Sequence, residues 1–379
     1  MTQAMINPEM LSWARERAGF AVPEFARKMG KTPEWLQEWE SGSRPLTFHQ
    51  ATQYAEKAYV PLGYLFLRQP PEETLPIPDL RTIENGEVRR PSAELLDVVK
   101  QMQERQEWYK DYLFENGGNE CRVVGRCKGS DSVDIIVADM RQTMRLPPHP
   151  TRGTWEEYYR GLVKQVESLG VLVMRLPHLG SHHRRFKVEE FRGFAMVDKV
   201  APLIFVNHAD APGARLFTLI HELCHVWLGE SGVSDGDANT HNHIEILCNA
   251  VAAEFLVPEE EFRQIWDREV EYWQENLKPL EAHFHVSTWA LARRAMTLGF
   301  ITKPDYLKYI AAEKKAHEDR EREGGGGGYY KNQKAWLSDR FSFAVSSQAL
   351  NGQIMLREAG HLLGMSPANL MKFAKEIGV

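Results

Sequence analysis

Cysteine is scarce in this chain of 379 residues, which contains only four. Disulfides are therefore not expected to hold the fold, and a reducing cytoplasm is the simplest location. The sequence also has no charged-then-apolar leader and no apolar run that approaches the roughly 18 residues of a membrane span. A secreted or membrane-spanning protein is not expected.

An excess of positive charge is missing as well. The formal net charge is −6 at pH 7, which argues against a chain that coats nucleic acid through bulk positive charge. Any contact with DNA must be local. Hydrophobic residues make up 43% of the sequence, and over this length they can bury a sizeable core in two or three domains.

What the chain does contain is an apolar stretch, residues 217–228, that carries the pattern H-E-x-x-H. Positions four apart share one face of a helix, so His221 and His225 are expected to point the same way. Two imidazoles at that spacing form one edge of a zinc site, and Glu222 is placed to act as the general base. The plainer alternative is a core helix, because this short pattern also occurs by chance.

A third ligand is expected on the next helix. Glycines and serines over residues 229–236 end the first helix, and a second helical stretch opens at residue 242. Glu245 lies on this second helix, with Asn249 one turn later on the same face. Two histidines and a glutamate with an open fourth position are typical of catalytic zinc sites.

Four further residues near this site have two interpretations each. His241 and His243 could stabilise the transition state from a loop that faces the site, or they are ordinary solvated histidines. Cys224 and Cys248 flank the ligands on the two helices, where oxidation could disturb the metal. The alternative for both thiols is simple packing as small buried side chains.

Residues 1–69 read as a run of short helices that includes a helix-turn-helix. Asn7 and Thr32 are expected to cap helices that begin with proline, and Gly19, Gly30 and Gly42 are expected to end helices. The segment 22–42 then holds two helices around a short turn. It resembles the DNA-binding domain of the phage repressor family.

The side chains of this module support DNA binding less well than its helix-turn-helix arrangement does. Residues 1–70 contain eight Lys/Arg and seven Asp/Glu, so phosphate contacts would be few. A module that docks a protein partner, or a second subunit of a homodimer, is the alternative. The candidate DNA-binding residues are Arg27, Lys28, Lys31, Gln37 and Arg44.

The remaining segments are expected to be mostly helical. A Pro-rich connector and a long amphipathic helix fill residues 70–118, further helices lie at 133–145 and 154–169, and strands lie at 170–174, 191–197 and 203–207. A charged helix and a glycine run follow at 312–328, and helices again at 329–379. The run Gly324–Gly328 is either a flexible linker or a place of close backbone approach. The last helix is expected to begin at Ser366 and to turn Leu370, Met371, Phe373 and Ala374 inward.

The residues around the metal helix resemble the ImmA/IrrE family of metallopeptidases. The similarity rests on the segment 215–225, on Glu245-x-x-x-Asn249 with the following Phe255-Leu-Val-Pro258, and on residues 280–299. It implies a zincin-like peptidase domain at 119–311 in an α+β, mostly α protein. It also implies that His221, His225 and Glu245 bind Zn²⁺, that Glu222 is the base, and that Asn249 supports a ligand.

The resemblance further implies a function in regulation. Members of the family are often fused to repressor-type helix-turn-helix domains, and some are encoded beside a toxin that the tail could bind. The leading hypothesis is a zinc endopeptidase that cleaves a repressor or antitoxin, with substrate added as a strand to a sheet edge around 191–207. The alternative is a non-proteolytic transcriptional regulator or antitoxin in which the zinc fold is a scaffold or sensor.

Overall fold

The computed structural model describes residues 5–80, 91–180, 183–234, 242–321 and 336–379. The chain divides into two compact units, Met1–Leu75 with Arg89–Asp97, and Pro76–Val88 with Val98–Val379. Many helices and one four-stranded sheet make up the described residues. The predicted class, α+β with mostly α structure, is confirmed.

The first unit is a small helical bundle. The side chain of Asn7 accepts a hydrogen bond from the backbone N of Glu9, and that of Thr32 accepts one from Trp35, so both predicted caps are present. Phe25, Trp39 and Tyr54 fill its core. Its elements are α1 (Pro8–Arg17), α2 (Val22–Met29), α3 (Pro33–Glu40), α4 (Phe48–Lys57) and the 3-10 helix η1 (Leu62–Phe66).

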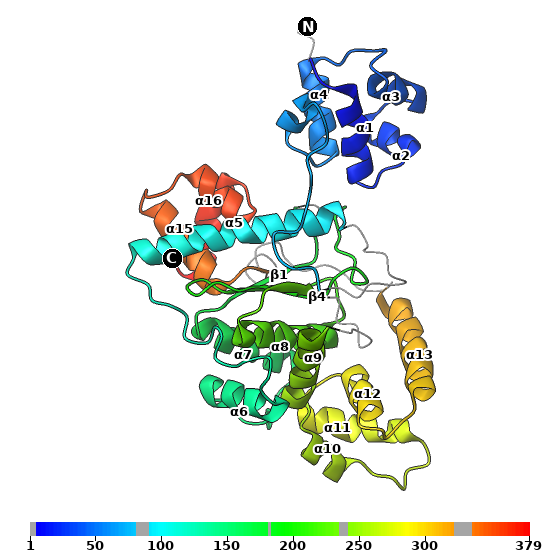
Figure 1. Ribbon diagram of the computed structural model, residues 1–379, viewed down its shortest axis with the longest axis vertical. Coiled ribbons are helices and arrows are strands. Elements are labelled where there is room, and N and C mark those ends of the chain that lie inside the picture. The colour runs from blue at the N-terminus through cyan, green and yellow to red at the C-terminus, as the bar shows by residue number, and fades with distance from the viewer. Residues whose placement is uncertain (1–4, 81–90, 181–182, 235–241, 322–335) are drawn as a thin grey trace. The chain divides into compact units, whose positions relative to one another are not determined.

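The second unit contains the sheet and most of the helices (Figure 1). Its strands are β1 (Leu172–Leu176), β2 (Gly193–Met196), β3 (Leu203–Asn207) and β4 (Gly232–Ser234). The helices that precede and surround the sheet are α5 (Ala93–Glu115), which belongs to this unit from Val98 on, α6 (Val133–Met144), α7 (Trp155–Ser168), α8 (Pro212–Leu228) and α9 (His243–Leu256). Those that follow are α10 (Glu259–Ile265), η3 (Trp273–Asn276), α11 (Leu277–Phe284), α12 (Thr288–Thr297), α13 (Lys303–Glu321), α15 (Asp339–Leu350), α16 (Leu356–Leu363) and α17 (Pro367–Ile377).

The strand order corrects one expectation about the sheet. The order is β1-β3-β2-β4, with β1 parallel to β3 and the other pairs antiparallel. The strands within 191–207 are therefore interior, and the prediction that they provide a free edge is wrong. The terminal strand β4 was not predicted, because three residues among glycines are too few to show an alternating pattern.

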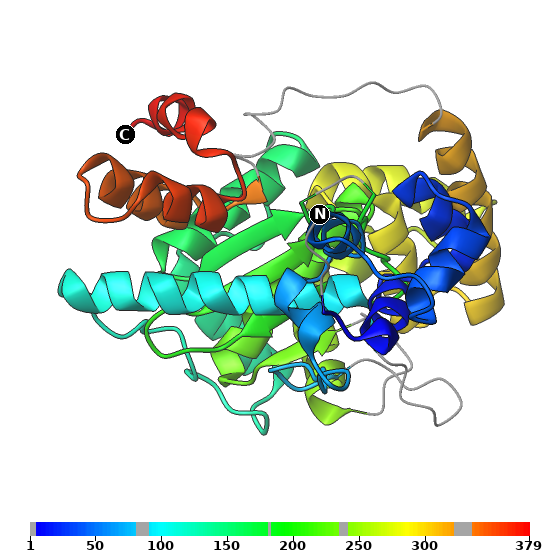
Figure 2. The same cartoon turned by 90° about the horizontal axis from the view of Figure 1, so that it is seen from above.

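Helices cover both faces of this sheet. Figure 1 shows α5 on one side and α7 and α8 on the other, and Figure 2 shows α5 running across the strands. The amide of Gln106 on α5 donates to the backbone oxygens of Met196 and Ala201, at 2.7 and 2.8 Å. On the opposite face, Val173, Ile204 and other apolar strand residues join one large core with α6–α9.

The helices α15–α17 pack on one another and on α5. The guanidinium of Arg105, buried on α5, donates to the backbone oxygen of Leu362 at 2.8 Å. On α17, Leu370, Phe373 and Ala374 are buried as predicted, but Met371 is 62% exposed, so its predicted inward position is wrong. One residue corresponds to about 100° around a helix, which turns Met371 away from its buried neighbour.

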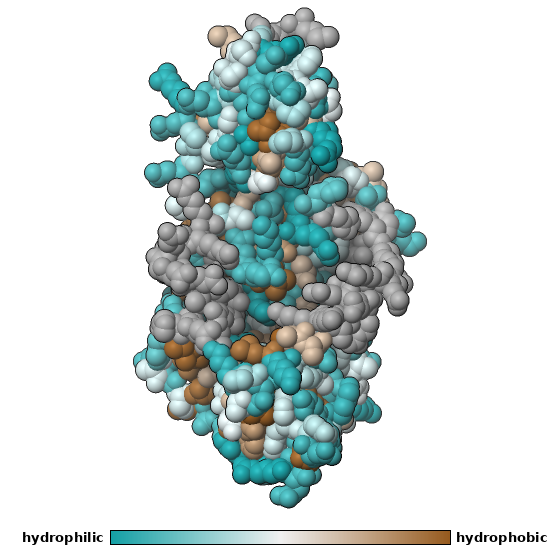
Figure 3. Space-filling model, turned by 90° about the vertical axis from the view of Figure 1, so that its right-hand side faces the viewer, coloured by the Kyte–Doolittle hydropathy of each residue, from teal (hydrophilic) through white to brown (hydrophobic). Residues whose placement is uncertain are grey.

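Hydropathy bears on two features of the structure, the exposed surface and the length of the helices. The face drawn in Figure 3 is mostly hydrophilic, and hydrophobic residues show there as small separate groups. Among the helices that the structure describes, none combines the length and the apolar composition that crossing a bilayer requires.

Candidate metal centre

Helix α8 lies at the centre of the second unit, between the sheet and α9. It begins at Pro212, where a missing N–H costs nothing, and it ends before Gly229, which adopts a left-handed conformation with φ of +76°. Leu219 and Leu223 are fully buried in the large core. Because α8 is packed on both sides, the polar side chains that it carries are held away from solvent.

Three of those polar groups meet at one point. The Nε2 atoms of His221 and His225 are 3.2 Å apart, as their four-residue spacing predicts. Glu245 on α9 approaches both, with Oε2 3.3 Å from His221 Nε2 and Oε1 2.9 Å from His225 Nε2. All three residues are buried, with at most 2% of each exposed.

This donor set fits a zinc ion. Zinc bonds of about 2.0–2.2 Å at tetrahedral angles place ligand atoms roughly 3.3–3.6 Å apart, close to the separations seen here. Two imidazole nitrogens and one anionic carboxylate oxygen are ordinary ligands of a zinc ion. Although burial opposes ionisation of Glu245, hydrogen bonds with His221 and His225 lower the pKa of this carboxyl to about 2.

Glu222 is the fourth titratable group of the site and faces the sheet. Burial raises the pKa of this carboxyl to about 8, although His221 and a hydrogen bond from Ser234 act in the opposite direction. The hydroxyl of Ser234 donates to Oε1. The other oxygen, Oε2, has no hydrogen-bond partner among the described residues.

Strand β2 approaches Glu222 closely at Gly193. A Cβ atom added to Gly193 would lie 2.8 Å from Glu222 Oε1 and 2.7 Å from Thr218 Cγ2. A separation below about 3 Å is a clash, so only glycine allows this strand and α8 to approach so closely. Gly193 and Ser234 are site residues that the sequence analysis missed, since neither belongs to a recognisable motif.

Helix α9 is held at both of its ends. The side chain of Asn242 accepts hydrogen bonds from the backbone N of Ile244 and of Glu245, which positions the first turn. Near the other end, Glu254 forms an ion pair with Arg294 of α12. Asn249 lies one turn beyond Glu245, as predicted.

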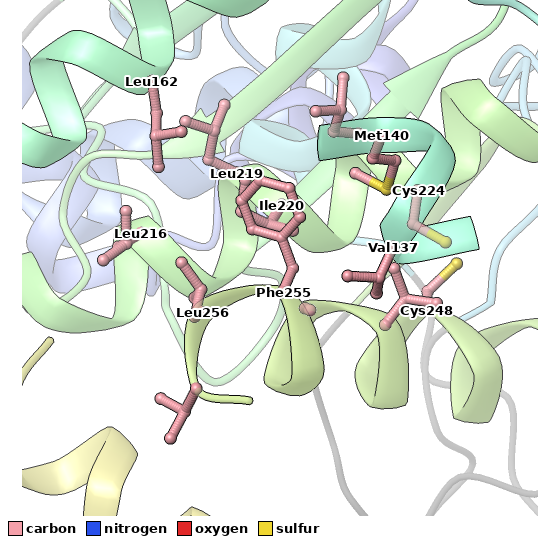
Figure 4. Packing of buried hydrophobic residues seen from close by; sticks show 14 of the residues in the cluster. Val137, Met140, Leu162, Leu216, Leu219, Ile220, Cys224, Cys248, Phe255 and Leu256 are labelled. Carbon is pink, nitrogen blue, oxygen red and sulfur yellow. The ribbon is translucent and has the colours of Figure 1, made fainter. Parts of the chain in front are cut away.

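The two thiols of α8 and α9 face one another. Figure 4 shows the sulfur atoms of Cys224 and Cys248 pointing together, beside Val137 and Met140 of α6. Both cysteines are completely buried and unoxidised. Burial and the neighbouring Cys224 raise the pKa of the Cys248 thiol well above its usual value, which favours the packing interpretation.

The remaining predicted residues lie outside this cluster or outside the described chain. His243 is exposed on the first turn of α9, whereas His241 and the run Gly324–Gly328 fall outside the described residues. In the first unit, Arg27 and Gln37 are exposed.

Three other candidate DNA-binding residues contact their own unit. Lys28 donates to the hydroxyl of Tyr59 at 2.7 Å. Lys31 and Arg44 lie over the ring of Trp35, at 4.7 and 3.9 Å from its centroid.

Two parts of the chain match known domain families. Residues 166–296 match the family model of the IrrE N-terminal-like domain (Peptidase_M78), and the match includes the three donors and Glu222. Residues 337–376, which contain α15–α17, match a domain of unknown function (DUF8813). No curated protein matches the chain. The central part of the chain is therefore similar to a metallopeptidase family, which supports the predicted ImmA/IrrE resemblance.

Proposed function

We propose that this protein is a zinc-dependent endopeptidase that cleaves a regulatory protein of the repressor or antitoxin type. The observation that supports this most directly is the position of Glu222, buried beside three convergent donor atoms with Oε2 left unpartnered among the described residues. A site that held a metal ion for structural reasons alone would not need this additional carboxylate.

Each residue of the site has a distinct role in this proposal. His221, His225 and Glu245 would hold zinc, which when bound supplies Lewis-acid polarisation of a carbonyl group and acidifies water. Glu222 would take a proton from the attacking water at Oε2 and return it to the leaving amine. Ser234 donates to Oε1 and so fixes the carboxylate with its other oxygen available for this exchange.

A substrate added to the sheet as a strand would need the edge nearest to Glu222, which belongs to β4. Residues 78–80 already pair with that edge. The backbone N of Val233 donates to the oxygen of Pro78, and the backbone N of Leu80 donates to the oxygen of Val233, both at 3.0 Å. Substrate binding along β4 would therefore require these residues to move away.

The same pairing suggests a way to raise the basal activity. Gly232 has no Cβ, and one placed there would collide with the side chain of Leu80. Leu80→Gly removes that side chain, so it should loosen the pairing with β4 and increase cleavage several-fold. Unchanged cleavage by Leu80→Gly would mean that substrate does not use this edge.

The first unit would dock the peptidase to DNA or to a protein partner. The contacts of Lys28, Lys31 and Arg44 within the unit leave fewer cations for a phosphate backbone, which supports a protein partner. A salt titration of binding to duplex DNA tests this choice. Salt-sensitive binding at low ionic strength would support DNA instead.

The C-terminal helices would bind a partner of the toxin type. Met355 and Met371 of this region are 76% and 62% exposed, so apolar side chains are available for such an interface. Co-purification with a toxin encoded beside this protein tests the proposal, with a chain that ends before residue 337 as the control.

The substrate can be sought directly with the purified full-length chain. Products of neighbouring genes would be incubated with it in the presence of zinc and, in parallel, in the presence of a chelator. Cleavage of a repressor or antitoxin that requires zinc supports the proposal. Binding without cleavage would favour the regulator that uses the zinc fold only as a scaffold or sensor.

A further inference from the structure

A second group of two histidines and one glutamate lies apart from the site described above. His149 follows α6 in a loop, Glu261 lies on α10, and His283 lies on α11. The Nε2 atoms of His149 and His283 are 2.9 and 3.1 Å from the same oxygen, Oε2 of Glu261. The two ring centroids are 4.2 Å apart, and all three residues are partly exposed.

The hydrogen bonds of His149 indicate which of its two ring nitrogens carries the proton. Its Nδ1 lies 3.1 Å from the backbone oxygen of Pro150, which can only accept a hydrogen bond, so Nδ1 carries the N–H. A neutral imidazole has only one N–H, so Nε2 then has no proton and carries a lone pair. This lone pair faces a carboxylate oxygen at 2.9 Å. Two acceptors at that distance repel unless a positive charge lies between them.

A second proton on His149 is one source of positive charge. It would make this ring an imidazolium, 4.2 Å from the ring of His283, and both rings would then donate to a single carboxylate oxygen. A metal ion satisfies all three groups at once, because two neutral nitrogens and one anionic oxygen are ordinary ligands of a divalent ion. A backbone carbonyl that accepts from the outer nitrogen is also the usual support of a histidine ligand.

We propose that His149, Glu261 and His283 form a second metal site, which takes a divalent transition-metal ion, zinc in the first instance. Their donor atoms lie within 4.8 Å of one another. Partial exposure leaves room for water to complete the coordination shell, as is usual when the protein provides three ligands. Tetrahedral coordination requires a small shift of these side chains, and partly exposed side chains can make it.

The contacts around this site indicate what the ion does. Arg141 of α6 donates through Nη2 to the backbone oxygens of Pro148 and Phe255, at 3.1 and 2.7 Å. The loop that carries His149 is thereby joined to the end of α9, the helix that carries Glu245. An ion bound here holds this loop, α10 and α11 together around that end, so it stabilises the fold and takes no part in peptide cleavage.

Counting bound zinc in the full-length protein tests the second site. The double variant His149→Gln/His283→Gln removes both nitrogen ligands, and His361→Gln is the matched control. His361 also faces a glutamate, Glu104, at 3.1 Å, but this pair is exposed and belongs to no cluster of three among the described residues. After equilibrium dialysis against Zn²⁺ and metal analysis, the wild type and the control should retain two ions per chain, and the double variant one.

One result would overturn the proposal, namely a double variant that retains as many ions as the wild type. A wild type with one ion and a double variant with none would instead place the ion at the second site and leave the first cluster empty. If the double variant does not fold by circular dichroism, Glu261→Gln is used, since it keeps the side-chain shape. This variant should weaken zinc binding at one of the two sites by at least about 10–100-fold. A loss of that size follows when only a residue hydrogen-bonded to a ligand is removed, and here a ligand itself is changed.

Thermal unfolding gives a second readout that does not depend on activity. Added Zn²⁺ should raise the Tm of the wild type in two concentration ranges, one for each site, because a ligand that binds the folded state stabilises it. The double variant should show one range, with its cleavage of substrate unchanged. Two unaltered ranges in the double variant would contradict a site at these residues.

Discussion

Two clusters of the same composition, two histidines and a glutamate, lie in one unit of this protein in different surroundings. In the first, His221, His225 and Glu245 are buried on two adjacent helices. In the second, His149, Glu261 and His283 come from a loop and two short helices and are partly exposed. Donor separations are similar in the two, 2.9–3.3 Å and 2.9–3.1 Å.

The two clusters differ in what surrounds donor atoms of the same kind, and the catalytic role that we propose for the first rests on those surroundings. The first cluster has a further carboxylate, Glu222, fixed by Ser234 and pressed against β2 at Gly193. Such a group can exchange a proton with a reacting molecule, and its burial strengthens every electrostatic interaction around it. The second cluster is held to the end of α9 by Arg141, which suits a structural role.

Removal of a ligand from the first cluster is expected to have the largest effect. His225→Ala should abolish cleavage and lower the bound zinc by one ion per chain, because two donors hold zinc much less tightly than three. His361→Ala is the control and should change neither quantity. Metal analysis and a cleavage assay on the same samples test this, and full activity of His225→Ala would remove the first cluster from the mechanism.

The close approach of β2 to Glu222 gives the next largest effect. Gly193→Ala places a methyl group against Glu222 and Thr218, so it should displace the base and lower cleavage strongly. The free energy of unfolding should fall by about 1–3 kcal/mol, the usual cost of overpacking a core.

Gly161→Ala on α7 is the matched control for this glycine. Gly161 is exposed and has no atom within 4 Å of an added Cβ, so alanine there should be neutral or stabilising by up to about 1 kcal/mol. Cleavage and denaturant unfolding of the two variants would be compared. Equal activity of both variants would mean that the contact between β2 and Glu222 does not matter.

A chelator should remove zinc from the two clusters at different times. A limited excess of a weak chelator should remove zinc first from the partly exposed second cluster, because its ligands are reached more easily than buried ones. Cleavage should persist through this first loss and fall only with the second. Samples withdrawn over time for metal analysis and assay would show this order, and an activity that falls with the first ion would reverse the assignment of roles.

The thiol pair behind the first cluster should have the smallest effect. Cys224 and Cys248 are buried, and the raised pKa of Cys248 makes its thiolate rare. Cys248→Ala should lower the free energy of unfolding by about 0.5–1.5 kcal/mol, the cost of a small buried deletion. Cleavage should resist mild peroxide equally with and without Cys248, and protection of the variant alone would establish a redox switch.

The first cluster could be predicted from the sequence because its residues follow helix periodicity. His221 and His225 are four positions apart, and Glu245 lies on the next helix beyond a run of glycines. Helix bounds were also predicted closely, both here and in the first unit, because stops such as Gly229 and caps such as Thr32 are local signals.

The rest of the site depends on tertiary structure, which local signals do not specify. Ser234 reaches Glu222 only because β4 joins the sheet beside β2, and the sequence around it indicates a turn. His149 and His283 are 134 positions apart (283 − 149), so no spacing rule brings them to Glu261. Met371 was misplaced because an apolar side chain on a short helix does not reveal which face is covered.

The central claim, that Glu222 makes the first cluster catalytic, is tested most directly by one cleavage assay with the metal content held equal. Wild type and Glu222→Gln, each loaded to the same zinc content, would be compared on the same protein substrate. The proposed mechanism predicts that Glu222→Gln keeps its zinc and loses about 10²–10⁴-fold in cleavage rate, the usual contribution of a general base. Cleavage by Glu222→Gln at the wild-type rate would contradict it.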